Sequence, residues 1–244
     1  MQSDASFRND LDFNRRRRAA ARRHHHARGV GDAKIDGDGR REETVDLGII
    51  QRLDPDDVRR AFRPGTRLLV TTHGSNVAGT LIPIGELADL AHEQGIPYLV
   101  DASQTAGAVP IDVEASGLDL LAFTGHKGLL GPTGTGGLYT HEGLTLQPLM
   151  RGGTGSDSAL EVQPDFMPDA YESGTLNVAG LAGLAASVRF LQEIGLETVA
   201  AHERRLVEQF LAKASEIPGV ILYGPEEMRL RCAVVSFNVA GLMP

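Results

Sequence analysis

Polar side chains that can bind or activate a small molecule directly follow three apolar segments of this 244-residue sequence. These residues are Asn76, Asp101, Gln104, Thr124, His126 and Lys127. In open α/β sheets, ligands bind beyond the carboxyl ends of the parallel strands. If the three apolar segments are such strands, the layout predicts one binding site along one edge of the sheet.

An amine, a carboxylate, a hydroxyl, an imidazole and an amide together suit a phosphorylated aromatic aldehyde. Lys127 can form a Schiff base with the aldehyde, and Asp101 can hold a pyridine nitrogen protonated, so that the ring withdraws electrons. A hydroxyl and an imidazole can bond phosphate oxygens, as Thr124 and His126 would. Attack by Lys127 requires a partly neutral amine, which implies a pKa lowered by burial or by a neighbouring cation.

Each of these residues also has an ordinary structural explanation. A carboxylate at a strand end often caps a turn, and a single lysine is usually solvated. Thr124 can cap a turn, His126 can be a core histidine, and Asn76 favours turns in any protein. We favour the binding site because the residues occur together at these spacings. For His73, a cofactor contact and a structural role both remain open.

Other ligands fit the sequence less well. The glycine-rich residues 131–137 follow Lys127, whereas a Walker loop has its lysine after the glycines. The same run leads into a strand, whereas a dinucleotide-binding fingerprint opens a helix. The sequence has no Gly-x-Ser-x-Gly motif, which excludes the usual hydrolase elbow. His73, Asp101 and His126 lack the paired spacing of a metal site.

The elements that would position these residues alternate between strands and helices. Apolar runs predict buried strands over residues 68–70, 97–100, 118–123 and 136–139. Helical periodicity and capping residues predict helices over residues 54–62, 83–94, 178–191 and 196–215. This order indicates an α/β fold with three layers, in which helices cover both faces of a mostly parallel sheet. Two short strands, 219–223 and 233–238, predict the start of a small α+β C-terminal domain.

Charge is unevenly distributed along the chain. Residues 1–41 hold 11 Lys and Arg against 6 Asp and Glu, although the whole chain has a net charge of −8. We predict a disordered basic tail over 1–41, since such a segment buries too little apolar surface to fold. A nucleic-acid or membrane-surface arm is the alternative for this tail. A partial large domain is then expected over 42–194, and the start of the small domain over 195–244.

The remaining composition argues for a protein of the cytoplasm. The acidic balance argues against a nucleic-acid-binding body. Cys232 is the single cysteine, so no intramolecular disulfide can form and a reducing compartment is expected. No apolar run is long enough for a membrane helix, and the basic N-terminus lacks the apolar stretch of a secretory signal.

Four runs of the sequence together resemble successive motifs of the class V aminotransferases, and most closely of their cysteine desulfurase subgroup. The runs are residues 72–80, 100–104, 124–127 and 131–134, within a similarity from about Asp46 to the C-terminus. The resemblance implies a fold-type I enzyme that depends on pyridoxal 5'-phosphate (PLP). The implied activity removes sulfur from L-cysteine to give alanine and a persulfide, which a sulfur-acceptor protein would receive.

The resemblance also implies a role for each matching residue. Lys127 would be the Schiff-base lysine, and Asp101 would pair with the pyridine nitrogen. Gln104 would bond the ring hydroxyl. Asn76 would contact the ring substituents or the carboxylate side of the substrate.

Two further residues and a partner subunit are implied for the phosphate. Thr124 stands where the family usually has serine, and His126 would be the second phosphate ligand. Thr175, in the run 172–175, would reach the phosphate of the neighbouring subunit, which implies a homodimer with shared sites.

The sequence also departs from the family. It lacks an upstream half of the large domain and a C-terminal region with the persulfide cysteine and a carboxylate-binding arginine, so it reads as a fragment or a rearranged gene product. We therefore expect low stability or aggregation of the isolated chain. Cys232 does not match the catalytic position and is expected to be structural. Another class V lyase or transaminase activity, or an inactive chain that at most binds PLP, remains the alternative.

Overall fold

The computed structural model describes residues 34–35, 41–42, 53–156 and 162–242. The chain divides into two units, residues 1–50 and 51–244. In the first unit, β1 (Lys34–Ile35) pairs with β2 (Arg41–Glu42) in antiparallel fashion. Most of the predicted tail, 1–41, therefore lies outside the described residues. The predicted domain boundaries near residues 41 and 195 stay predictions.

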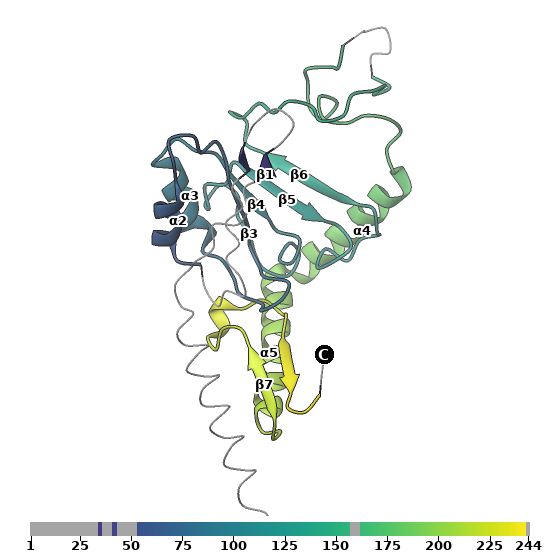
Figure 1. Cartoon of the computed structure of the whole chain (residues 1–244). Coiled ribbons are helices and arrows are strands. Elements are labelled where there is room, and N and C mark those ends of the chain that lie inside the picture. Colours follow the sequence, from purple (N-terminus) through teal and green to yellow (C-terminus); the bar gives the residue numbers. More distant parts are fainter. Residues whose placement is uncertain (1–33, 36–40, 43–52, 157–161, 243–244) are drawn as a thin grey trace, which may run out of the picture. The chain divides into compact units, whose positions relative to one another are not determined.

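The second unit is built on a four-stranded sheet (Figure 1). Its strands, in spatial order, are β3 (Leu69–Thr72), β4 (Tyr98–Asp101), β5 (Leu120–Thr124) and β6 (Gly136–Thr140). β3, β4 and β5 run parallel, and β6 runs antiparallel to β5. The carboxyl ends of β3, β4 and β5 consequently meet at one edge of the sheet, as the sequence predicted.

Two helices pack beside β3 and β4 (Figure 1). α2 (Pro55–Ala61) begins after Asp54, whose carboxylate accepts a hydrogen bond from the backbone N–H of Asp56 at 2.9 Å, which caps the helix as predicted. α3 (Ile84–His92) buries its predicted apolar stripe. The stripe meets the fully buried β4 residues Tyr98 and Val100, and this contact forms the centre of the core.

The remaining elements lie beyond the sheet. α4 (Val178–Ile194) runs beside β5 and β6 on the side away from α2 and α3 (Figure 1). α5 (Leu196–Ser215) packs against the antiparallel pair β7 (Val220–Tyr223) and β8 (Ser236–Val239), with a 3₁₀ turn at Met228–Leu230 between the two strands. Among the described residues, no helix is long and apolar enough to cross a membrane.

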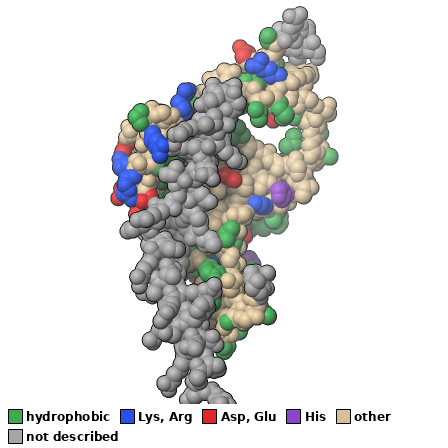
Figure 2. Space-filling view, viewed as in Figure 1, with side chains coloured by type: hydrophobic (Ala, Val, Ile, Leu, Met, Phe, Trp, Pro, Cys, Tyr) green, Lys and Arg blue, Asp and Glu red, His purple; other side chains and the backbone are tan. Residues whose placement is uncertain are grey.

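The expectation that every strand would be buried on both faces is wrong for the two outer strands. Val70 of β3 is 56% exposed and Leu138 of β6 is 46% exposed. Both strands stand at an end of the sheet as described, so neither has a second neighbouring strand. Figure 2 shows charged side chains of both signs over α2. Within this helix, Arg60 pairs with Asp57. Charge thus covers α2, while apolar side chains of β3 and β6 remain exposed at the two ends of the sheet.

Candidate active site

The loops that follow β4 and β5 touch each other through their backbones. Gly107 has a φ of +85°, and a Cβ atom there would lie 2.4 Å from the carbonyl carbon and oxygen of Gly128. A Cβ atom on Gly128 would in turn lie 2.6 Å from the carbonyl oxygen of Ala106. Only glycine permits such an approach with this backbone conformation. The segment that carries Asp101 and the one that carries Lys127 are therefore held in direct contact.

The loop after β3 is joined to the loop after β4 through a buried histidine. His73 is 7% exposed, and a hydrogen bond of 2.9 Å joins its Nδ1 to Oγ1 of Thr105. The backbone N–H of His73 donates to the carbonyl of Asp101 at 2.8 Å. Burial lowers the pKa of His73 to about 4, so the imidazole is neutral at pH 7. For this residue, left open by the sequence, the structure shows buried contacts between the two loops.

Asp101, Gln104 and Asn76 extend along the same edge of the sheet. Asp101 ends β4 and lies opposite Thr72 of β3 and Ala122 of β5. One of its carboxylate oxygens accepts a hydrogen bond from the backbone N–H of Ser103 at 2.8 Å. The predicted cap role and the predicted ligand role of Asp101 are thus compatible, because a carboxylate has several acceptor sites. Gln104 is half-buried, and Asn76 is exposed in its loop.

The loop after β5 brings together three of the predicted residues. A hydrogen bond of 2.7 Å joins Oγ1 of Thr124 to Nδ1 of His126. Lys127 is exposed and makes no ion pair with any described side chain. The loop closes on itself, since the backbone N–H of Gly131 donates to the carbonyl of Gly125 at 2.7 Å. The half-buried hydroxyl of Thr124, at the end of β5, therefore lies beside the exposed His126 and Lys127 of one constrained loop.

Thr175 is not brought to this edge by any described contact. It is exposed in the segment that leads into α4, whose first turn is capped by the Asn177 side chain. Its neighbour Gly174 donates a backbone hydrogen bond to Gly153 at 2.8 Å. The predicted contact of Thr175 with a neighbouring subunit stays a prediction.

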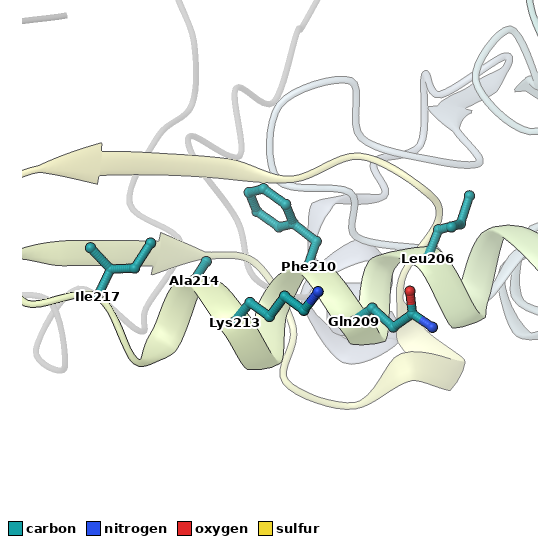
Figure 3. A pocket seen from close by; sticks show the side chains of 6 residues that line it. All are labelled: Leu206, Gln209, Phe210, Lys213, Ala214 and Ile217. Carbon is teal, nitrogen blue, oxygen red and sulfur yellow. The ribbon is translucent and has the colours of Figure 1, made fainter.

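A shallow pocket lies elsewhere, along α5, and contains none of the predicted site residues (Figure 3). Its lining is Leu206, Gln209, Phe210, Lys213, Ala214 and Ile217. The ring of Phe210 packs at 5.8 Å from that of Phe237 on β8. We assign this mostly apolar pocket to packing between α5 and its hairpin. Among residues 53–156 and 162–242, no cluster of His, Cys, Asp and Glu could hold a metal ion.

Cys232 lies before β8 and outside any strand, and β8 begins at Ser236, which corrects the predicted strand 233–238. It is buried as expected for a structural residue, and its backbone N–H donates to the carbonyl of Gly79 at 2.8 Å. Burial raises the pKa of its thiol. A buried thiol with a raised pKa is a poor nucleophile.

Sequence reasoning missed Thr105, Gly107 and Arg231. Thr105 and Gly107 directly follow the predicted residues 101–104, so their place in the chain was a usable signal. Arg231 is buried although it is charged. An arginine directly before the apolar run 232–235 was the signal for a buried cation, but the sequence did not show that the carbonyls of Tyr223, Pro225 and Val234 would surround it.

The comparison of sequences gives a family and a set of relatives. The family profile described as Aminotransferase class-V matches residues 25–244, and so begins within the predicted tail. A probable cysteine desulfurase of Methanothermobacter thermautotrophicus is 38% identical over 217 residues, which cover 84% of this chain and 53% of that protein. A cysteine desulfurase of Escherichia coli (strain SE11) is 37% identical over 183 residues, covering 73% and 44%. The chain spans about half the length of the curated relatives it matches.

Solved structures agree with the sequence relatives. The apo structure of a cysteine desulfurase from Thermococcus onnurineus NA1 matches with a TM-score of 0.71 and 38% identity, covering 79% of this chain and 49% of that one. The cysteine desulfurase CsdA of Escherichia coli, in an S-sulfonic acid form, matches with a TM-score of 0.69 and 29% identity, covering 78% and 47%. The predicted α/β fold with a mostly parallel sheet is confirmed. By its profile match, its relatives and its fold, this chain belongs to the class V aminotransferase family, and within it is similar to the cysteine desulfurases.

Proposed function

We propose that this chain forms the PLP-binding part of a cysteine desulfurase, an enzyme that converts L-cysteine to alanine and transfers the sulfur to a thiol. The observation that carries the proposal is the backbone contact between Gly107 and Gly128, which holds the loop of Asp101 against the loop of Lys127. Several relatives that span these loops are named cysteine desulfurases. The proposal extends to a homodimer in the cytoplasm.

The residues at the sheet edge fit PLP. The exposed amine of Lys127 is not neutralised by a described carboxylate, so it is available to bind the cofactor aldehyde covalently. The carboxylate of Asp101 would accept a hydrogen bond from the protonated pyridine nitrogen, and Gln104 would bond the ring hydroxyl. When bound, PLP supplies an electron-withdrawing ring that stabilises negative charge on an amino-acid substrate.

Phosphate and substrate contacts would come from the neighbouring residues. Thr124 and His126 already share a hydrogen bond of 2.7 Å, so each presents a polar atom at the same point of the loop, where phosphate oxygens can be held. Asn76 would orient the ring substituents or the substrate carboxylate. Thr175 would complete the phosphate site of the second subunit in the homodimer.

The sulfur-transfer step needs a thiol other than Cys232. In the overall reaction the Cβ–S bond of L-cysteine breaks, an S–S bond forms to the accepting thiol, and Cβ gains a hydrogen atom, so no external oxidant or reductant is required. Cys232 is 5% exposed and burial raises its thiol pKa, which leaves little thiolate at neutral pH. We therefore assign Cys232 to packing, and expect a sulfur-acceptor protein to receive the persulfide sulfur.

A labelling experiment tests the cofactor assignment. The chain has three lysines, Lys34, Lys127 and Lys213, so the modified residue can be identified without ambiguity. The purified chain is mixed with PLP, reduced with borohydride and digested for mass spectrometry. We expect the reduced cofactor on Lys127, with loss of the visible absorbance in Lys127→Arg. The matched control Lys213→Arg, on α5, should retain both signals.

Two outcomes would contradict the proposal. Labelling that spreads equally over the three lysines would indicate adventitious reaction with exposed amines. A Lys127→Arg variant with unchanged absorbance would place the covalent bond elsewhere.

To distinguish desulfurase from another class V activity, L-cysteine is supplied with a reducing thiol to accept sulfur, and alanine and sulfide are measured. Transamination would instead yield a keto acid.

A further inference from the structure

The loop that carries Asn76, residues 73–82, is closed on itself by its own hydrogen bonds. The backbone N–H of Ser75 donates to the carbonyl of Thr80 at 2.9 Å. The hydroxyl of Ser75 accepts from the backbone N–H of Ala78 at 3.0 Å. Asn76 stands exposed within this closed unit. The backbone position of Asn76 is therefore set by whatever holds the loop as a whole.

A segment far along the sequence holds the returning arm of this Asn76 loop. The backbone N–H of Leu81 donates to the carbonyl of Leu230 at 2.8 Å, and that of Cys232 donates to the carbonyl of Gly79 at 2.8 Å. The hydroxyl of Ser236 donates to the carbonyl of Val77. Three hydrogen bonds thus join residues 77–81 to residues 230–236, which lie within the predicted small-domain segment 195–244.

The backbones of the Asn76 loop and of residues 224–234 also approach each other closely. At Gly224, whose φ is +97°, a Cβ atom would lie 2.1 Å from the carbonyl oxygen of Ala78. At Gly79, whose φ is +71°, a Cβ atom would lie 2.3 Å from the carbonyl oxygen of Val234. Both positions combine a left-handed backbone with a neighbour that excludes any side chain. Residues 223–236 therefore form a clasp, in which the Asn76 loop lies between Gly224 and Val234.

The side chain of Arg231 holds the two sides of this clasp together. Its guanidinium donates to the carbonyls of Tyr223 at 2.7 Å, Pro225 at 2.9 Å and Val234 at 3.1 Å. Arg231 is 6% exposed and makes no ion pair with a described carboxylate. A planar guanidinium satisfies three carbonyls in fixed directions, whereas a lysine ammonium on a flexible stem does not reproduce that geometry.

We propose that Arg231 is a positioning residue for the Asn76 loop, acting through residues 223–236 on the predicted cofactor site. The proposal rests on the proposed function. Arg231 itself contacts none of the predicted cofactor residues in the described hydrogen bonds. Arg231 acts through the backbone, because the carbonyls that it bonds belong to the segment against which Gly79 and Ala78 pack. A change at Arg231 should therefore shift the Asn76 loop and leave Asp101 and Lys127 in place, because neither residue bonds to the Arg231 side chain.

The test compares Arg231→Lys with Arg229→Lys in the full chain. Arg229 is two residues away, has a 70% exposed side chain and pairs with Glu227 on the surface, so the same substitution there is a matched control. Hydrogen exchange is followed by mass spectrometry in peptides covering 73–82, and PLP affinity by its visible absorbance, below the melting temperature of each variant. For Arg231→Lys we expect faster exchange in 73–82, unchanged exchange in β4 and β5, and PLP affinity weaker by about 3- to 30-fold.

A second variant tests whether a change smaller than unfolding of the clasp also affects the Asn76 loop. Ser236→Ala removes only the hydroxyl that bonds Val77, and should shift exchange in 73–82 in the same direction by a smaller amount. The proposal is overturned if folded Arg231→Lys leaves exchange in 73–82 at the wild-type rate, or if Arg229→Lys has an equal effect. If the wild-type chain binds no PLP, the proposed function fails, and exchange in 73–82 alone decides whether Arg231 positions the loop.

Discussion

Acid should destabilise this protein through one buried side chain, His73. It is 7% exposed, and burial lowers its pKa from 6.5 to about 4. In the unfolded chain the imidazole is solvated and takes up a proton near its ordinary pKa. Between these two values the unfolded state binds more protons than the folded state. Stability is therefore complete above about pH 6.5 and falls as the pH is lowered toward the folded-state pKa.

The size of this effect follows from the two pKa values. Each unit of difference corresponds to about 1.4 kcal/mol, so a displacement from 6.5 to about 4 sets an upper limit of about 3 kcal/mol. The linkage relation places about 2 kcal/mol of this loss between pH 7 and pH 5, where only the unfolded chain is protonated. A marginally stable domain has about 5–15 kcal/mol in total, so the loss is measurable.

The assay is urea unfolding of the wild type and of His73→Asn at pH 7, 6 and 5. Asparagine keeps a polar atom near the position of Nδ1, which bonds Thr105 at 2.9 Å, but does not titrate. We expect the free energy of unfolding of the wild type to fall by about 2 kcal/mol more than that of His73→Asn over this range. His202→Asn, at an exposed position on α5, serves as the control and should keep the wild-type slope. Equal pH dependence of the wild type and His73→Asn would refute the reasoning.

Two further substitutions test the local structure, with unfolding free energies as the measurement. Gly107→Ala should lower the free energy of unfolding by more than about 2 kcal/mol, because φ is +85° and the new Cβ would meet Gly128. The control Gly65→Ala, at a position with open space around it, should change that free energy by no more than about 0.5 kcal/mol. Similar losses for the two variants would contradict the close contact. Asp54→Ala should cost about 1 kcal/mol by removing the cap of α2, and Asp54→Asn should restore most of it; equal effects of the two would argue against the cap.

Much of the secondary structure and the edge of the sheet were predictable because their causes are local. The cap at Asp54 and the apolar stripe of α3 are properties of consecutive residues, and both are confirmed. The carboxyl end of β4 was read correctly at Asp101, because an apolar run ends there. The cofactor roles of Asp101 and Lys127 stay predictions.

Other features needed the tertiary structure, because they depend on which segment becomes whose neighbour. Residues 68–70 are apolar enough for a buried strand, yet Val70 is half exposed because β3 ends the described sheet. An apolar run indicates that its residues can be buried. Whether they are covered depends on which strands and helices pack beside them in the folded chain. The antiparallel direction of β6 was likewise undetermined by its composition.

By itself, the sequence determined which residues can do chemistry and the order in which strands and helices present them, since residue type and short-range period are written in the chain. Tertiary structure alone decided that His73 is a buried contact between loops, that Gly107 meets Gly128, and that Arg231 holds the clasp on the Asn76 loop. The His73 and Gly107 contacts, and the bonds between residues 230–236 and the Asn76 loop, join segments well apart in sequence. Their energies come from burial and close approach, which no local pattern encodes.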